Sequence, residues 1–166
     1  MDLFEYAKSK TLDRESPLAS RLRPTTLDEV VGQEHIVGKD KLLYRAIKAD
    51  KLTSVIFYGP PGTGKTTLAK VIANTTSASF TQINATVAGK KDMEEVVKEA
   101  QDRLGMYGKK TILFIDEIHM IVGAGACSND ESLDFSNALK PLLAGDKSIV
   151  IGATTEEEYQ KAFSKE

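Results

Sequence analysis

A glycine-rich run at residues 59–66 has the residue types and spacing of a phosphate-binding loop. It reads Gly-Pro-Pro-Gly-Thr-Gly-Lys-Thr and fits the pattern G-x-x-x-x-G-K-[ST]. An apolar, β-branched segment, residues 54–58, precedes the run, and residues 66–73 carry apolar side chains at helical spacing. The loop is therefore predicted to join a strand to a helix, which is the context in which this motif binds phosphate.

Each residue type in this loop has a chemical reason to be there. Gly62 and Gly64 allow the backbone angles with which successive N–H groups close around phosphate oxygens. Lys65 places a cation in the first helical turn, where the helix dipole disfavours it unless an anion lies nearby. Thr66 offers a hydroxyl to Mg²⁺. We therefore predict a nucleoside triphosphate site with these contacts: Pro60, Pro61, Gly62, Thr63, Gly64, Lys65, Thr66 and Thr67.

A pair of carboxylates follows the unbroken apolar segment 111–115, which is typical of a strand covered on both faces. Asp116 and Glu117 would be unfavourable at the end of such a strand without partners. Ligands bound beyond the carboxyl ends of parallel strands supply such partners. We predict that Asp116 holds Mg²⁺ together with Thr66, and that Glu117 orients or deprotonates the attacking water.

Other polar residues are weaker candidates. Thr154 or Thr155 ends the last predicted strand and is placed to sense the terminal phosphate; we prefer Thr155, although it fits a helix N-cap equally well. His35 and His119 lack the spacing of metal ligands, so we expect surface or packing roles for both. The single cysteine, Cys127, has no nearby Cys or His and is expected to be an incidental thiol.

The composition is that of a globular domain. Of the 166 residues, 41% are hydrophobic and 28% are charged, and the net charge of -2 creates no overall field that favours nucleic acid. No apolar stretch approaches the roughly 20 residues of a membrane span. The N-terminus lacks the basic, apolar and small-residue order of a secretory signal. We therefore expect a cytoplasmic protein without a membrane partner.

Apolar periodicity and turn residues predict residues 1–20 as an N-terminal arm and residues 21–166 as a nucleotide-binding core. The alternation of strands and helices implies a mostly parallel sheet covered on both faces, the three-layer α/β/α fold of P-loop NTPases. Strands are predicted at 54–58, 80–84, 111–115 and 148–152. Helices are predicted at 26–32, 43–50 and 66–73, from a cap at Asp92, around 135–142 with a kink or end at Pro141, and from a cap at Thr155.

Three other classes of nucleotide enzyme fit less well. The string Asp-Glu-Ile-His from residue 116 also matches DExH helicases, but those enzymes need a second nucleotide-binding lobe. The Asn-Lys-x-Asp string with which GTPases read guanine does not occur. A small-molecule kinase would need an acceptor site, and none is evident.

Taken together, these motifs resemble those of AAA+ ATPases. Residues 59–66 match Walker A, residues 112–117 match Walker B, and residues 152–155 match the strand end that carries sensor 1. The resemblance implies the large subdomain of that fold, with ATP or ADP and Mg²⁺ as cofactors. It also implies an adenine site formed by four upstream residues: Arg23, Pro24, Val31 and Gly32.

More narrowly, residues 1–118 resemble the RarA/MgsA family of replication-associated recombination ATPases, whereas residues 119–166 are similar to the first ATPase domain of Clp unfoldases. Because both parts follow the same chain order, we interpret the change near His119 as an engineered or recombined hybrid in preference to a natural one. The RarA-like strings are 1–6, 17–24 and 84–92. The Clp-like strings are 120–126, 137–143 and 152–159.

The RarA-like part implies Mg²⁺-dependent ATP binding and slow hydrolysis in replication or recombination, with DNA as a candidate partner. The alternatives are a nucleotide-binding module with little turnover and a fragment of a Clp-type protein unfoldase. Residues 86–91 lack the aromatic residue with which Clp motors grip polypeptide, so threading is disfavoured.

The expected sheet order of the AAA+ class, 5-1-4-3-2, has a consequence for the edge of this sheet. Only four strands are readable, and neither the fifth strand, the lid nor the arginines that neighbouring subunits supply can be identified. We therefore expect weak activity. We also expect self-association as a dimer, or partial instability, because segment 54–58 becomes a sheet edge with unpaired backbone groups unless the N-terminal arm covers it.

Overall fold

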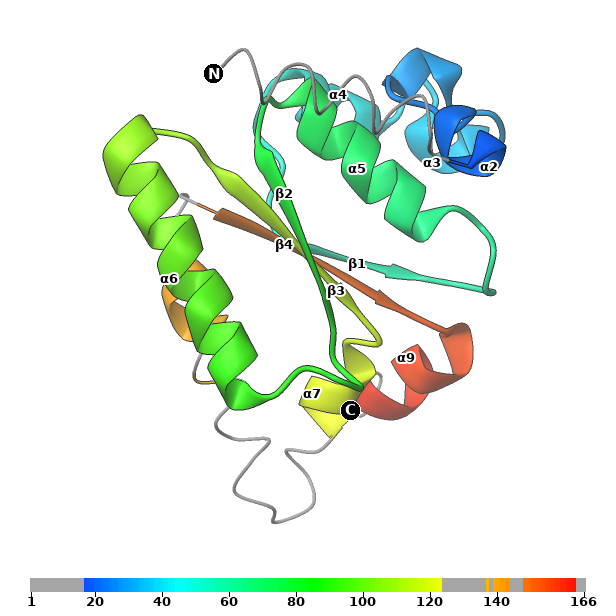
Figure 1. Cartoon of the computed structure of the whole chain (residues 1–166). Coiled ribbons are helices and arrows are strands. Elements are labelled where there is room, and N and C mark those ends of the chain that lie inside the picture. Colours follow the sequence, from blue (N-terminus) through cyan, green and yellow to red (C-terminus); the bar gives the residue numbers. More distant parts are fainter. Residues whose placement is uncertain (1–16, 124–136, 138, 144–147, 164–166) are drawn as a thin grey trace.

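Four parallel strands form the centre of the protein in this computed structural model (Figure 1). The structure describes residues 17–123, 137, 139–143 and 148–163. The sheet has the order β1-β4-β3-β2, and every neighbouring pair is parallel. The strands are β1 (Val55–Tyr58), β2 (Ser79–Asn84), β3 (Thr111–Asp116) and β4 (Ser148–Thr154).

Helices cover both faces of this sheet, so the predicted three-layer α/β/α fold is confirmed. One face packs on α5 (Lys65–Thr75), with the 3₁₀ turn η1 (Leu27–Glu29) and α4 (Leu42–Lys48) beyond it. The other face packs on α6 (Lys90–Tyr107), α7 (His119–Gly123) and the helical residues 139–143. In Figure 1, α5 and α6 lie on opposite sides of the strands. Within the described residues, the remaining helices are α2 (Leu18–Arg21), α3 (Glu34–Val37) and α9 (Glu156–Phe163).

The central strand β3 supplies both hydrophobic cores, because successive side chains of a strand point to opposite faces. Ile112 and Phe114 pack in the core beneath α5, and Leu113 and Ile115 pack in the core beneath α6. All four side chains are fully buried. This double burial explains why the segment is apolar without alternation.

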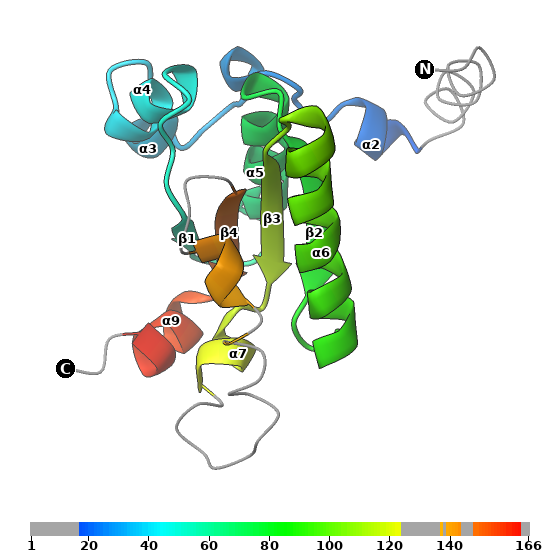
Figure 2. The ribbon, with the colours of Figure 1, turned by 90° about the vertical axis from the view of Figure 1, so that its left-hand side faces the viewer.

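The carboxyl ends of the strands meet α7 and α9. Figure 2 shows both helices beyond the arrowhead of β3. A parallel sheet collects its strand ends at one edge, and in such folds ligands bind there. The fold therefore places the phosphate loop, the two carboxylates and the end of β4 on the same side of the molecule.

The predicted strands are confirmed, and β4 is longer than predicted because it continues to Thr154. The prediction that Asp92 caps α6 is wrong. Gly89 is the N-cap, and the Asp92 carboxylate lies one turn in, where it accepts the Gly89 N–H at 2.7 Å. The helix around 135–142 does not end at Pro141, since residues 142 and 143 are helical. Thr155 precedes α9 as predicted, and its hydroxyl accepts the Glu158 N–H at 3.4 Å.

The helix predicted at 26–32 is one 3₁₀ turn, closed by a capping box between Thr26 and Glu29. The Thr25 N–H donates to the Glu29 carboxylate at 2.7 Å, and this hydrogen bond lowers the pKa of Glu29. The helices α2, α3 and α7 were not predicted, because elements of four or five residues are too short to show a helical period.

Some predictions fall outside the described residues. These are the arm over residues 1–16 and the role of Cys127. The boundary at residue 20 stays a prediction, and it falls within α2. Within the described ranges, no helix has the length and apolar character needed to cross a membrane.

Candidate functional site

A cavity of about 390 Å³ opens at the carboxyl end of the sheet. Its walls come from the phosphate loop and the start of α5, from the turn after β3, and from the end of β4. The cavity therefore joins segments that lie far apart in the sequence. It brings together ten of the predicted site residues: Arg23, Pro61, Gly62, Gly64, Lys65, Thr66, Thr67, Asp116, Glu117 and Thr155.

The backbone of the phosphate loop depends on glycine. Gly62 has a φ of 79° and Gly64 a φ of 88°, in the left-handed region that side chains disfavour. Gly64 is also the N-cap of α5, so the loop runs directly into a helix N-terminus. The Gly59 N–H donates to the Thr154 carbonyl at 3.3 Å, which ties the loop to β4. This arrangement points backbone donors and a helix dipole at the cavity.

The Lys65 side chain folds back over its own loop. Its Nζ donates to the Gly59 carbonyl at 3.0 Å and to the Pro60 carbonyl at 2.8 Å, and lies 3.4 Å from the Thr63 hydroxyl. These contacts place Pro60 and Thr63 beside the site, although neither lines the cavity. They also correct the expectation that only a bound anion accounts for Lys65, because the loop itself supplies hydrogen-bond acceptors. The unfavourable interaction with the helix dipole remains, and among the described residues no carboxylate pairs with Lys65 to offset it.

The turn after β3 holds the two predicted carboxylates. The Glu117 N–H donates to Asp116 Oδ1 at 3.2 Å, and Glu117 adopts a left-handed φ of 56°, which is uncommon for a residue other than glycine. The next amide, of Ile118, donates to the Ala153 carbonyl at 3.0 Å. The turn is therefore held against β4, with both carboxylates half-buried at the cavity wall.

The residues present fit a magnesium ion of the kind that accompanies nucleotides. Such an ion is held by one or two protein oxygens and by phosphates and water, without an all-protein cage. Asp116 and Thr66 line the same cavity, and their carboxylate and hydroxyl are hard oxygen ligands. Across the described ranges, no cluster of three or more His, Cys, Asp or Glu side chains could form a dedicated metal cage.

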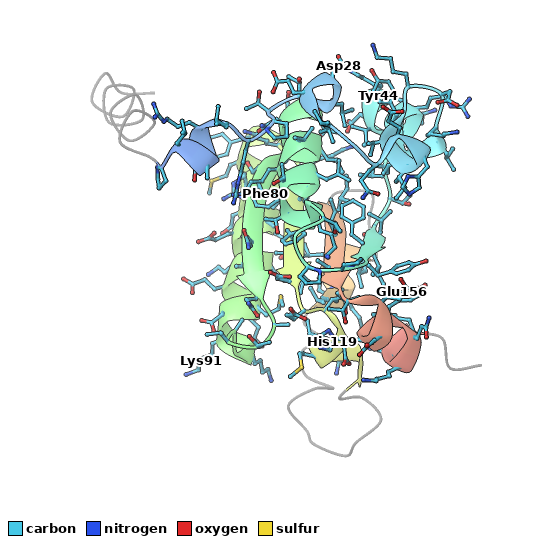
Figure 3. The ribbon with its side chains drawn as sticks, turned by 90° about the vertical axis from the view of Figure 1, so that its right-hand side faces the viewer. Asp28, Tyr44, Phe80, Lys91, His119 and Glu156 are labelled. Atoms are coloured by element: carbon cyan, nitrogen blue, oxygen red, sulfur yellow. The ribbon has the colours of Figure 1, made fainter. Side chains whose placement is uncertain are left out.

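His119 is the site neighbour that sequence reasoning missed. Its Nδ1 lies 2.9 Å from the Thr154 hydroxyl and 3.4 Å from Glu117 Oε2, and its side chain is only 14% exposed. Figure 3 shows His119 on α7, beside α9. The sequence contained one hint, because Thr154 was one of the two candidates for the end of the last strand. Nothing in the spacing of residues 119 and 154 indicated a contact between them.

Thr154 and Thr155 both line the cavity, but in different settings. Thr154 is the last residue of β4 and is 3% exposed. Thr155 is half-buried, and its hydroxyl accepts a backbone N–H at the start of α9. The preference for Thr155 as the residue near the terminal phosphate stays a prediction.

The phosphate cavity does not gather the four predicted adenine contacts. Of these four, only Arg23 lines the phosphate cavity. Gly32 lines a separate cavity of about 610 Å³ among η1, α3 and α4, and Val31 is 97% exposed. Figure 3 places Asp28 and Tyr44, which line this second cavity, at the opposite end of the molecule from His119. The second cavity is larger, but it contains no phosphate-loop residue, so we assign the phosphate chemistry to the smaller one.

The profile of the family described as "ATPase family associated with various cellular activities (AAA)" matches residues 55–164. This match spans all four strands, the phosphate loop and both carboxylates. The chain belongs to the AAA family. The resemblance to AAA+ ATPases is thereby confirmed at the level of the family.

Curated relatives of this AAA protein carry names from replication and recombination. It is 46% identical to replication-associated recombination protein A of Coxiella burnetii, over 84% of this chain and 29% of the relative. The identity to the Bacillus subtilis protein of the same name is 43%, over 86% of this chain and 30% of the relative. It is also 40% identical to the ATPase WRNIP1 of Dictyostelium discoideum, over 85% of this chain and 15% of the relative. The chain thus spans about a third or less of each of these relatives.

These matches bear on the expected change of resemblance near His119. The first of them covers 140 residues of a chain of 166, so it must pass residue 119 wherever it begins. The RarA-like similarity therefore continues across the expected seam. The comparisons give no support to a hybrid with a Clp unfoldase.

Solved structures agree with the fold. The protein titled "Thermotoga maritima RuvB Holliday junction branch migration motor" matches with a TM-score of 0.58 at 28% identity, over 81% of this chain and 42% of that one. The FIGL-1 AAA domain, solved in complex with ADP, matches with a TM-score of 0.53 at 20% identity, over 84% of this chain and 46% of that one. The second likeness shows the fold alone.

Proposed function

We propose that this AAA protein binds ATP with Mg²⁺ and hydrolyses it slowly, as the ATPase core of a RarA-like replication and recombination protein. The observation that carries the proposal is that one cavity is lined by four residues of the required chemistry: Lys65, Thr66, Asp116 and Glu117. These are the groups that phosphoryl transfer to water requires. The names of the curated relatives support the biological setting.

Each residue has a distinct role in this proposal. The loop amides and Lys65 bind the phosphates, and Asp116 and Thr66 hold Mg²⁺, which neutralises charge on the phosphate oxygens. Glu117 orients the attacking water and accepts its proton. Thr155 contacts the terminal phosphate. Adenine binding by four upstream residues stays a prediction; these are Arg23, Pro24, Val31 and Gly32. The cytoplasmic location also stays a prediction.

Nucleotide binding is tested by calorimetry with MgATP and MgADP. We expect Lys65→Ala to weaken ATP affinity about 10-fold or more, because a charge-assisted hydrogen bond to phosphate is lost. The matched control is Lys70→Ala on the same helix, since the Lys70 ammonium lies 5.7 Å from the centre of the Phe80 ring and does not line the cavity. The proposed nucleotide site would be contradicted if the wild type gave no heat of binding, or if Lys65→Ala kept the full ATP affinity.

Hydrolysis is tested separately by steady-state phosphate release. We expect Glu117→Gln to lower the rate by about 10²-fold or more at unchanged ATP affinity, because the water loses its base. Glu94→Gln on the exposed face of α6 is the control and keeps the wild-type rate. Equal rates of phosphate release in Glu117→Gln and the wild type would favour the alternative hypothesis, a nucleotide-binding module with little turnover.

DNA is the partner that we propose for this core. The support is the printed names of its relatives and of the RuvB structure, since the net charge of -2 does not favour nucleic acid. Binding through phosphate contacts predicts that log K falls linearly with log salt concentration. A salt titration with duplex and single-stranded DNA measures the slope. A DNA affinity that does not change with salt concentration, or no DNA binding at low salt, contradicts the proposal.

A further inference from the structure

Two strand ends meet at the imidazole of His119. Glu117 belongs to the turn after β3, and Thr154 closes β4. The Nδ1 atom lies 2.9 Å from the Thr154 hydroxyl oxygen and 3.4 Å from Glu117 Oε2. The three side chains are buried or half-buried, and Glu117 and Thr154 line the cavity. One ring nitrogen is therefore shared by two groups of the proposed ATPase site.

The chemistry of these groups indicates where the proton lies. An ionised carboxylate only accepts hydrogen bonds, so its contact with Nδ1 is favourable only when Nδ1 carries hydrogen. The Thr154 hydroxyl oxygen lies closer to Nδ1 than the Glu117 carboxylate does. The hydrogen on Nδ1 is therefore also donated to the Thr154 oxygen. A hydroxyl that accepts a hydrogen bond keeps its own proton for a different acceptor. On the side of the cavity, the acceptor expected for that proton is a phosphate oxygen.

We propose that His119 is a positioning residue for ATP hydrolysis. Its Nδ1–H holds the Glu117 carboxylate and turns the Thr154 hydroxyl proton toward the cavity. Because this inference rests on the proposed function, it adds one specific requirement: hydrolysis needs a hydrogen-bond donor at the position of Nδ1, whereas nucleotide binding does not.

The hydrogen bond itself is tested without nucleotide, by long-range ¹H–¹⁵N correlation of the full chain near pH 8, where histidine is ordinarily neutral. The chain has two histidines, and the exposed His35 serves as the reference signal. The spectrum of His119→Asn assigns the signals. We expect the Nδ1–H tautomer at His119. The Nε2–H tautomer would mean that Thr154 donates to the ring, and that result overturns the inference.

The functional consequence is tested with two variants of nearly equal shape. His119→Asn keeps an amide N–H about where Nδ1 lies, whereas His119→Leu removes the donor. We expect kcat to fall about 10-fold in His119→Leu, with KM for ATP within about twofold of wild type, because misplacing a catalytic group affects the chemical step. We expect His119→Asn to recover kcat to within about threefold. Met120→Ala, on the exposed side of the same helix, is the control and keeps wild-type values.

The outcomes separate this inference from the proposed function. A wild type that gives no heat with MgATP and no Glu117-dependent phosphate release contradicts the proposed function, and the tautomer measurement then decides on the hydrogen bond alone. Wild-type hydrolysis with equal kcat in His119→Leu and His119→Asn overturns the role of His119 and leaves the ATPase intact. A change in KM without a change in kcat also overturns it. Thermal melting of both variants checks that each is folded.

Discussion

At the scale of single residues, Gly152 in β4 determines how closely the turn after β3 can approach. A Cβ atom at Gly152 would lie 2.5 Å from Cδ1 and 2.9 Å from Cγ2 of Ile118, which is closer than side chains tolerate. Ile118 lies between Glu117 and His119, and its amide is bonded to the Ala153 carbonyl. The absence of a side chain at Gly152 therefore lets both site residues pack against β4.

We expect Gly152→Ala to destabilise the protein by about 1–3 kcal/mol, because overpacking forces Ile118 to move. Urea unfolding measures the change. Gly105→Ala on α6 is the matched control, since no atom outside its chain neighbours and its own helix backbone lies within 4 Å of the added Cβ. This variant should stabilise the helix by about 0.5–1 kcal/mol. If the two variants shift the free energy of unfolding alike, the packing at Gly152 is not the cause.

At the scale of elements, α6 is secured at its N-terminus by a side chain of its own first turn. The Asp92 carboxylate accepts the Gly89 N–H at 2.7 Å, and its negative charge lies where the helix dipole favours an anion. Beyond this turn, Met93, Val97 and Ala100 are buried against the sheet. This hydrogen bond therefore secures the start of α6 on the face opposite α5, and α6 contributes no residue to the cavity.

Replacing Asp92 by Ala should lower the free energy of unfolding by about 0.5–2 kcal/mol, because the Gly89 amide loses its partner. Asp102→Ala in the exposed part of the same helix is the control, with an effect within about ±0.5 kcal/mol. Chemical denaturation measures both. ATP affinity should be unchanged in either variant. A loss of stability as large in Asp102→Ala as in Asp92→Ala would contradict the stabilising role of the hydrogen bond between Gly89 and Asp92.

At the scale of the whole molecule, β1 is an edge strand, as predicted, because among the described residues it pairs with β4 alone. Tyr58 at its end is half-exposed and stacks on Tyr159 of α9, with ring centres 4.1 Å apart. Edge strands present unpaired N–H and C=O groups to other chains. Association through this edge is the prediction that follows at this scale.

We expect reversible, concentration-dependent self-association in analytical ultracentrifugation. A chain that starts at residue 17 should associate at least as strongly, because the predicted arm can no longer cover the edge. The comparison of the two chains is its own control. A stable monomer of the shortened chain at high protein concentration would contradict the prediction.

Most of the fold could be predicted because its signals are local. The apolar strand 111–115, the glycines of the phosphate loop and the cap at Thr155 each depend on neighbours within a few positions. The predictions that failed also have local reasons. Asp92 is a good N-cap residue, but Gly89 can begin the helix three positions earlier, and α7 is too short to show a period.

The candidate site also has features that the sequence predicts and features that depend on packing. The sequence alone determined the phosphate loop, the paired carboxylates and their meeting at the carboxyl ends of parallel strands, because residue types and strand order suffice for these. Only the tertiary structure decided that Lys65 binds its own loop, that Gly32 lines a different cavity, and that His119 reaches Thr154. The last contact joins residues 35 positions apart, and it exists because β3 and β4 pair in one register with Ile118 seated over Gly152. Such a contact depends on packing across strands, which no spacing along the chain encodes.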